Sequence, residues 1–159
     1  MTGIVLMIQD DFFPDSHWDI DFIEKATILM NKDASIGCFR LYPCPGPEDE
    51  TQLGIFNGIT YGEIHKGEMY RASCQVALWR PEYLTSILNK VGGTAGNFEI
   101  NGSSVDVPGR VLSVLRSSTK WPASYLCSGI SRGFWNQAAF DLFTKENIPY
   151  KHAEYNIFL

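Results

Sequence analysis

Hydrophobic and polar positions are most sharply divided near the start of the chain. Residues 4–8 are all apolar, three of them Ile or Val, and the acidic pair Asp10 and Asp11 follows closely. A continuous apolar run of this composition is typical of a strand buried on both faces of a sheet. Because open α/β sheets bind ligands beyond the carboxyl ends of their strands, we expect a central strand with the acidic pair at a ligand site.

Three further segments have the apolar spacing of amphipathic helices. The first covers about residues 20–30, and Asp19 can cap its amino end because its side chain accepts a backbone N–H. The second begins at Pro81, where the missing N–H costs nothing, and stops at residues 92–93, which are both Gly. The third covers residues 134–146 and is broken by Pro149. The pattern therefore predicts three helices.

The remaining apolar segments predict strands. Residues 36–42, 111–115 and 125–130 are short apolar runs, while residues 59–64 and 70–79 are expected to form a hairpin across the turn at 65–68. The glycine- and amide-rich residues 94–103 are expected to form a loop. Together these elements predict a single α/β domain over residues 1–159, with a mixed sheet flanked by helices.

Composition narrows the classes of function. The chain has 159 residues, enough to bury a substantial core, and its net charge of −5 disfavours nucleic acid as a partner. Its four cysteines show neither a C-x-x-C pair nor a zinc-like spacing to His, so we expect reduced thiols in an intracellular, cytoplasmic protein. No apolar run has the roughly 20 residues of a transmembrane segment, and no basic signal-peptide segment precedes the first strand.

The acidic pair admits two interpretations. Adjacent carboxylates repel each other and are costly near a core unless a cation neutralises them, and a divalent metal carrying a phosphate is one such cation. Alternatively, Asp10 and Asp11 belong to a solvated acidic turn that Asp15 continues.

Five short motifs follow one another along the chain. They are QDDFF at 9–13, CFRLYP at 38–43, YRASCQVALWR at 70–80, NFEINGS at 97–103 and GISRGFW at 129–135. Their order resembles the C-terminal two thirds of nucleotide-sugar-dependent glycosyltransferases with the A-type fold. The resemblance covers most of the chain, and the order of the motifs is more specific than any one of them.

The resemblance implies roles for several residues. Asp10 and Asp11 would hold Mn²⁺ or Mg²⁺ on the diphosphate of the donor, with His152 completing the metal site. The family often has an acidic residue where this chain has Gln9. Glu99 would be the general base that takes the proton from the acceptor hydroxyl. The implied partners are a nucleotide-sugar donor and a glycan acceptor.

Three other side chains are candidates for substrate binding. Arg71 and Arg132 can pair with phosphate in a bidentate fork, although a structural ion pair is the commoner use of arginine. Trp135 can stack on a sugar face, with core packing as the alternative. If one cleft holds the whole site, the sugar ring and the diphosphate lie between Glu99 and the acidic pair. Adding them to the hydrogen-bond reach of a general base places Glu99 on the order of 8–14 Å from the pair.

One departure from the family affects the expected assembly. The βα units that bind the nucleotide in the family precede the acidic strand, and this chain has none of them. We therefore expect a fragment or truncated homologue whose open sheet edge is covered in a homodimer. Three functions stay open: a glycosyltransferase, a non-catalytic glycan- or nucleotide-binding module, and a structural or interaction domain.

Overall fold

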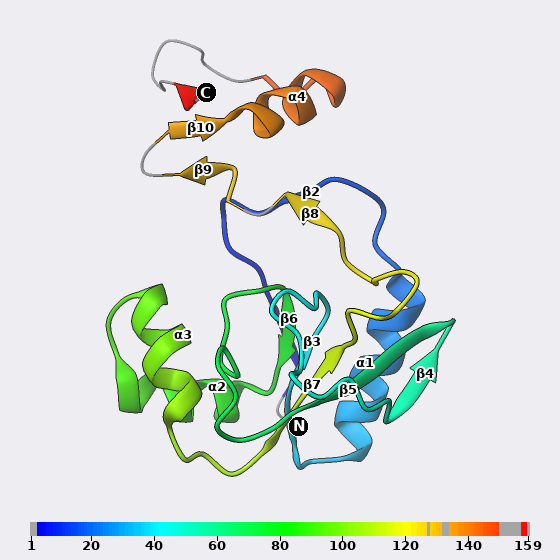
Figure 1. Cartoon of the computed structure of the whole chain (residues 1–159), viewed down its shortest axis with the longest axis vertical. Helices are drawn as coiled ribbons and strands as arrows, with labels where there is room; N and C mark the ends of the chain where they lie inside the picture. The colour runs from blue at the N-terminus through cyan, green and yellow to red at the C-terminus, as the bar shows by residue number, and fades with distance from the viewer. Residues whose placement is uncertain (1–2, 127, 132–133, 150–156, 159) are drawn as a thin grey trace. The chain divides into compact units, whose positions relative to one another are not determined.

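The chain folds into two compact units, described here from a computed structural model (Figure 1). The structure describes residues 3–126, 128–131, 134–149 and 157–158. The first unit consists of Asp19–Ala123 and the segment that ends at Ile8, and the second consists of Gln9–Trp18 and the segment that begins at Ser124. Each unit is taken by itself below.

A mixed six-stranded sheet forms the first unit, in the order β1-β6-β3-β7-β5-β4. Its strands are β1 (Val5–Met7), β3 (Ile36–Arg40), β4 (Gly54–Phe56), β5 (Ile59–Ile64), β6 (Ala77–Trp79) and β7 (Arg110–Val114). Strands β3 and β7 are parallel, and the other neighbours are antiparallel. This confirms the predicted α/β class with a mixed sheet.

Strand β3 is the buried centre of this sheet, because all five of its residues are buried. On one face, Phe39 meets Phe22 of helix α1 (Ile20–Lys32) edge to face, with ring centroids 5.8 Å apart. On the other face, Cys38 belongs to the core under helices α2 (Pro81–Val91) and α3 (Ala95–Ser104). Figure 1 shows α1 on the opposite side of the sheet from α2 and α3.

The predicted starts and stops of two helices are confirmed. The Asp19 carboxylate accepts a hydrogen bond of 2.9 Å from the backbone N–H of Phe22, which caps α1. Helix α2 begins with Pro81 in its first turn and ends at Gly92, whose φ of +55° suits a residue without a Cβ. The buried stripe of α1 is Phe22, Ala26 and Met30, at a spacing of four residues.

The position predicted for the first strand is wrong. Strand β1 lies at an edge of the sheet, where it pairs only with β6 among the described strands. Val5, Leu6 and Ile8 are between 40% and 46% exposed. An apolar run identifies a strand, but it does not determine how many neighbours that strand has, and here β3 takes the central place instead.

The predicted hairpin between residues 59–64 and 70–79 is also wrong. Strand β5 pairs with β4 and β7, and only Ala77–Trp79 of the second segment is a strand. The turn between β4 and β5 is Asn57-Gly58, with φ of +50° and +77°. An Asn-Gly pair favours the tight turn of a two-residue hairpin, so β5 is paired locally with β4 and not with the later segment.

Residues 94–103, predicted as a loop, form the N-cap and nearly all of helix α3 instead. The Thr94 hydroxyl caps the helix by accepting from the backbone N–H of Asn97 at 3.3 Å. Phe98 and Gly102 are buried, and a Cβ on Gly102 would lie 3.1 Å from the side chain of Ile87 on α2. The glycine that suggested a loop lets the two helices approach closely, and this packing outweighs a weak helix propensity.

The second unit is small and rich in aromatic residues. Its elements are β2 (Phe13–Pro14), β8 (Tyr125–Leu126), β9 (Ile130–Ser131), β10 (Phe134–Asn136), α4 (Gln137–Lys145) and β11 (Ile157–Phe158). The ring of Phe13 lies 5.0 Å from that of Phe143 on α4 and 5.9 Å from that of Trp135. Helix α4 begins three residues after the predicted start at residue 134, because the Asn136 side chain caps it. The strand predicted over residues 125–130 is present as two short strands.

Candidate functional site

Glu99 is held by the loop that precedes β6. It lies on α3, half-buried, and its Oε1 accepts hydrogen bonds from the Ser73 hydroxyl at 3.0 Å and from the Cys74 backbone N–H at 2.9 Å. Both bonds reach the same oxygen. Within the described part of the chain, Oε2 has no hydrogen-bond partner. An oriented carboxylate with one free oxygen is the arrangement that a general base requires.

A pocket of about 180 Å³ opens beside this carboxylate. Residues 67–70 form one wall, and Glu99, Ile100, Ser103 and Ser104 of α3 form the other. Met69, Tyr70 and Ile100 are exposed, so the rim is largely apolar. The pocket therefore combines an acceptor oxygen with an aromatic ring and apolar surface, which suits a small hydroxylated ligand with an apolar face.

The Glu99 carboxylate also affects the pKa of the neighbouring Cys74 thiol. Burial raises the pKa of the Cys74 thiol to about 11, and the charge of Glu99 adds to the rise. The protonated thiol lines an apolar cavity with Met7, Leu84 and Phe98. At neutral pH Cys74 is therefore a poor nucleophile, and its position makes it a reporter of the Glu99 charge.

The acidic pair lies in a turn of the second unit. The Phe12 backbone N–H donates to the Gln9 carbonyl at 3.2 Å, and the Asp11 carbonyl accepts from the backbone N–H of Gly129 at 2.8 Å. Burial raises the pKa of Asp11, its own backbone N–H partly lowers it, and the charge of Asp10 raises it again. Asp10 is exposed and Asp11 is half-buried, so the pair fits both interpretations given to it, a cation site and a solvated acidic turn.

The donor set of this turn suits a metal that is shared with a phosphate. Mg²⁺ is commonly held by one or two carboxylates together with substrate phosphates, and Asp10 and Asp11 can supply the two carboxylates. No group of three or more His, Cys, Asp or Glu side chains able to hold a metal occurs among the described residues. The third predicted ligand, His152, lies outside the described residues, as does Arg132.

Arg71 has a structural place in the first unit. Its side chain is 5% exposed. The guanidinium donates to the Tyr83 hydroxyl at 2.7 Å, to the Gly109 carbonyl at 2.7 Å and to the Ile64 carbonyl at 3.2 Å. These bonds tie the loop before β6 to α2, β5 and the start of β7, which accounts for a buried arginine without a ligand.

Trp135 is half-buried in the second unit, in β10. Its ring packs against Phe143 at 5.2 Å between centroids and against Phe140 at 6.4 Å. Of the two interpretations given to it, these contacts are those of a core residue. The sugar-stacking role stays a prediction, and so does the convergence of the acidic pair on Glu99, because the pair and Glu99 belong to different units.

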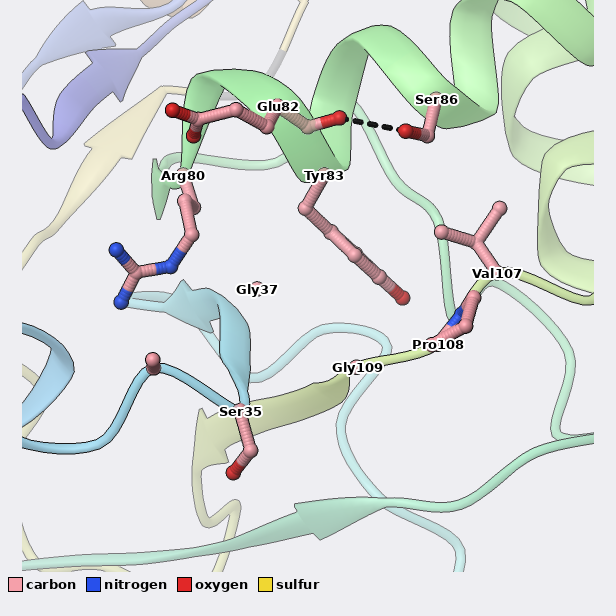
Figure 2. A pocket seen from close by; sticks show the side chains of 10 residues that line it. Ser35, Gly37, Arg80, Glu82, Tyr83, Ser86, Val107, Pro108 and Gly109 are labelled. Carbon is pink, nitrogen blue, oxygen red and sulfur yellow. Dashed lines mark hydrogen bonds between the residues drawn. The ribbon is translucent and has the colours of Figure 1, made fainter. Parts of the chain in front are cut away.

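A larger cavity of about 470 Å³ lies elsewhere in the first unit, between the start of α2 and residues 107–109 (Figure 2). Arg80 lines it, but its guanidinium donates to the carbonyls of Met30 at 2.5 Å and Ile36 at 3.2 Å. The Ser86 hydroxyl donates to the Glu82 carbonyl at 2.7 Å. Because the Arg80 and Ser86 side chains donate to backbone carbonyls, they are not available to a ligand. The smaller pocket beside Glu99 is therefore the better candidate site.

The sequence singled out Glu99 as a candidate but gave no indication of the groups that orient it. Ser73 is 1% exposed and lies 26 positions away from Glu99 in the sequence. Both residues occur in the motifs noted above, at 70–80 and 97–103, yet no spacing rule connects them. Only the packing of α3 against this loop brings them together.

No family model, curated protein or solved structure matches this chain. No helix in the described ranges combines the length and the apolar character needed to cross a membrane.

Proposed function

We propose that this chain transfers a sugar from a nucleotide-sugar donor to a hydroxyl group of a glycan acceptor, with Glu99 as the general base. The observation that carries the proposal is the Glu99 carboxylate, fixed through Oε1 by Ser73 and Cys74 while Oε2 stays available beside a pocket. The order of the five sequence motifs supports the same reaction.

The chemistry asked of Glu99 is a single proton transfer. The acceptor hydroxyl attacks the anomeric carbon of the donor, and its proton passes to Oε2 as the new carbon–oxygen bond forms. The bond from the anomeric carbon to the diphosphate breaks, and the diphosphate leaves with the bonding electrons. The base must lie within about 2.6–3.2 Å of the hydroxyl oxygen, a reach that the free Oε2 can supply.

The acidic turn would serve the leaving group. Asp10 and Asp11 are the residues that would hold Mn²⁺ or Mg²⁺, and such an ion, when bound, neutralises charge on the departing diphosphate. The raised pKa of Asp11 means that the turn loses negative charge on acidification more readily than an isolated aspartate does. Asp10 and Asp11 would therefore hold such an ion less tightly as the pH falls.

The acceptor side is the pocket next to Glu99. Its volume of about 180 Å³ leaves room for one monosaccharide ring, and the exposed Tyr70 offers an aromatic face for the apolar side of that ring. The Ser103 hydroxyl donates its proton to the Glu99 backbone carbonyl within α3, so it is not available as a donor to a ligand. Ser104 is exposed at the pocket wall.

A non-catalytic glycan-binding module is the second candidate. It is favoured by one observation, namely that the exposed Met69, Tyr70 and Ile100 give the pocket an apolar rim, which can hold a sugar without any chemistry. A module of this kind would use the same pocket without a metal or a base. Turnover separates the two candidates.

The test compares binding with turnover. Purified protein with Mn²⁺ is given a panel of nucleotide sugars and acceptor glycans, and release of nucleoside diphosphate is measured alongside donor affinity by calorimetry. Glu99→Gln should keep the donor affinity and reduce transfer at least about 100-fold, the usual contribution of a general base. Glu82→Gln, an exposed residue of the other cavity, is the matched control. Full transfer by Glu99→Gln would overturn the assignment.

A further inference from the structure

A buried arginine stands directly behind the Glu99 pocket. Arg40 is the last residue of β3 and is 1% exposed. Its Nη1 donates to the Pro45 carbonyl at 2.5 Å, and its Nη2 donates to the carbonyls of Tyr70 at 2.6 Å and Arg71 at 3.2 Å. Burying a charge is costly unless it is hydrogen-bonded, so these carbonyls are part of what keeps Arg40 in the core.

Tyr70 has an unfavourable backbone conformation at the point where Arg40 holds it. Its φ of +57° is in the left-handed region, which residues with a Cβ seldom occupy. Such a conformation persists only where the surrounding structure fixes it. The charge-assisted bond from Arg40 to the Tyr70 carbonyl is a contact that holds the backbone at this residue.

The loop that contains Tyr70 builds the Glu99 site from two sides. Met69 and Tyr70 line the pocket, while Ser73 and Cys74 bind the Glu99 carboxylate. Between them, the Ala72 backbone N–H donates to the Ser103 hydroxyl on α3 at 3.1 Å, and that hydroxyl lies 3.2 Å from the Ala72 carbonyl. Any rotation of the backbone at Tyr70 therefore moves both the pocket wall and the donors that orient Glu99.

We propose that Arg40 is a positioning residue for the Glu99 site, and that it acts by holding Tyr70 in the left-handed conformation. The catalytic consequence rests on the proposed function, whereas the structural coupling between Arg40, Tyr70 and the Glu99 donors does not. Lysine cannot replace Arg40 in this role, because an ammonium group lacks the planar fork that reaches the Pro45 and Tyr70 carbonyls together.

Cys74 gives a measurement of this coupling that does not depend on activity. In a Cys44→Ser, Cys127→Ser background, the rate of alkylation at about pH 8 reports the thiolate fraction of Cys74, whose pKa is about 11. If the loop relaxes, Cys74 loses burial and moves away from the Glu99 charge. Each unit by which its pKa falls raises the thiolate fraction at this pH about tenfold, and the alkylation rate rises with that fraction.

Two variants of Tyr70 test the conformation without changing the buried arginine. Tyr70→Val removes the ring and disfavours positive φ strongly, because a β-branched side chain fits that region badly. Tyr70→Gly removes the same ring but accepts positive φ freely. We expect Tyr70→Val to accelerate Cys74 alkylation at least tenfold, and Tyr70→Gly to leave the rate within twofold of the parent.

Arg40→Lys should accelerate Cys74 alkylation as Tyr70→Val does. In the double variant Arg40→Lys, Tyr70→Gly the slow rate should return, because glycine adopts positive φ without the hydrogen bond from Arg40. Arg110→Lys is the control, since Arg110 pairs with Asp33 and Glu63 on the other side of β7. A merely structural Arg40 would lower thermal stability without this rescue. Equal rates of Cys74 alkylation in Tyr70→Val and Tyr70→Gly would overturn the proposal. This comparison is valid even if Arg40→Lys fails to fold.

The same variants separate this inference from the proposed function. In an active enzyme, Arg40→Lys should lower kcat for transfer while leaving KM for the donor unchanged. If alkylation responds as expected and no variant, including the parent, transfers sugar, Arg40 still positions Glu99 and only the glycosyltransferase assignment falls. If the parent protein transfers sugar and Arg40→Lys leaves Cys74 alkylation unchanged, the role of Arg40 is overturned and the proposed function is not.

Discussion

The backbone N–H of Cys74 donates a 2.9 Å hydrogen bond to the carboxylate of Glu99, 25 positions further along the chain. This bond joins the loop before β6 to helix α3 and places a thiol beside a carboxylate. The negative charge of Glu99 contributes to the raised pKa of the Cys74 thiol, after the larger effect of burial. The pair therefore links the orientation of the candidate base to a group whose titration can be followed directly.

The first prediction uses this link. Glu99→Gln removes the negative charge but keeps the shape, so the pKa of Cys74 should fall below about 11 while burial keeps it above the ordinary value of 9.0. The pH dependence of Cys74 alkylation, with Cys44 and Cys127 replaced by Ser, gives this pKa. Glu68→Gln lines the same pocket and serves as the control. An unchanged pKa in Glu99→Gln would show that the two groups are not adjacent in solution.

The second prediction concerns stability in alkali. The pKa values of Cys38 and Cys74 are raised to about 12 and about 11, chiefly by burial, from an ordinary value of 9.0. As the pH rises through this window, the unfolded chain loses protons that the folded chain keeps, so the free energy of unfolding should fall. Urea denaturation at about pH 8 and about pH 10.5 measures the loss, and Cys74→Ala should reduce it.

The third prediction concerns the acidic turn. Asp11→Asn removes one of the two neighbouring carboxylates and should abolish the Mn²⁺-dependent part of donor binding. Asp15→Asn, an exposed residue of the same segment, should leave donor binding unchanged. Calorimetric titration of a nucleotide sugar with and without Mn²⁺ provides the comparison. Equal metal dependence in the two variants would remove the metal role from Asp11.

The fourth prediction concerns the packing of α2 on β3. A Cβ on Gly37 would lie 2.3 Å from Cγ of Tyr83, so the ring and the central strand cannot both keep their places in Gly37→Ala. Overpacking of this kind costs roughly 1–3 kcal/mol of the free energy of unfolding. Gly96→Ala, whose Cβ would meet only the Thr94 side chain at 3.9 Å, should not destabilise the protein. Chemical denaturation distinguishes the two.

The fifth prediction is the homodimer. Strand β1 is an edge strand with exposed apolar side chains at Val5, Leu6 and Ile8 and no charge from residue 3 to residue 9, so antiparallel pairing with a second copy would bring no like charges together. Leu6→Lys should shift a dimer to monomer in sedimentation velocity experiments. Ile28→Lys changes an exposed residue of α1 and should not. A monomeric parent protein at high concentration would contradict the expectation.

The sequence was informative wherever the relevant interactions are local. The cap at Asp19, the proline and glycine at the two ends of α2, and a strand over residues 36–42 were all predicted from neighbouring residues, because helix termini and strand patterns depend on contacts within a few positions. Glu99 was likewise singled out as a candidate from a short motif. The Asn57-Gly58 turn is a local signal as well, and it would have assigned β5 its correct partner, β4.

Only the tertiary structure decided which strand is central and what surrounds Glu99. The apolar run ending at Ile8 contains nothing that determines whether one or two strands pair with it, and β6 and β3 settle that by pairing with each other. Helix α3 forms because Phe98 and Gly102 pack against other elements, against the weak propensity of its own residues. Ser73, Cys74 and Arg40 come to the Glu99 site from distant positions, since hydrogen bonds between such segments exist only once the sheet and its helices have assembled.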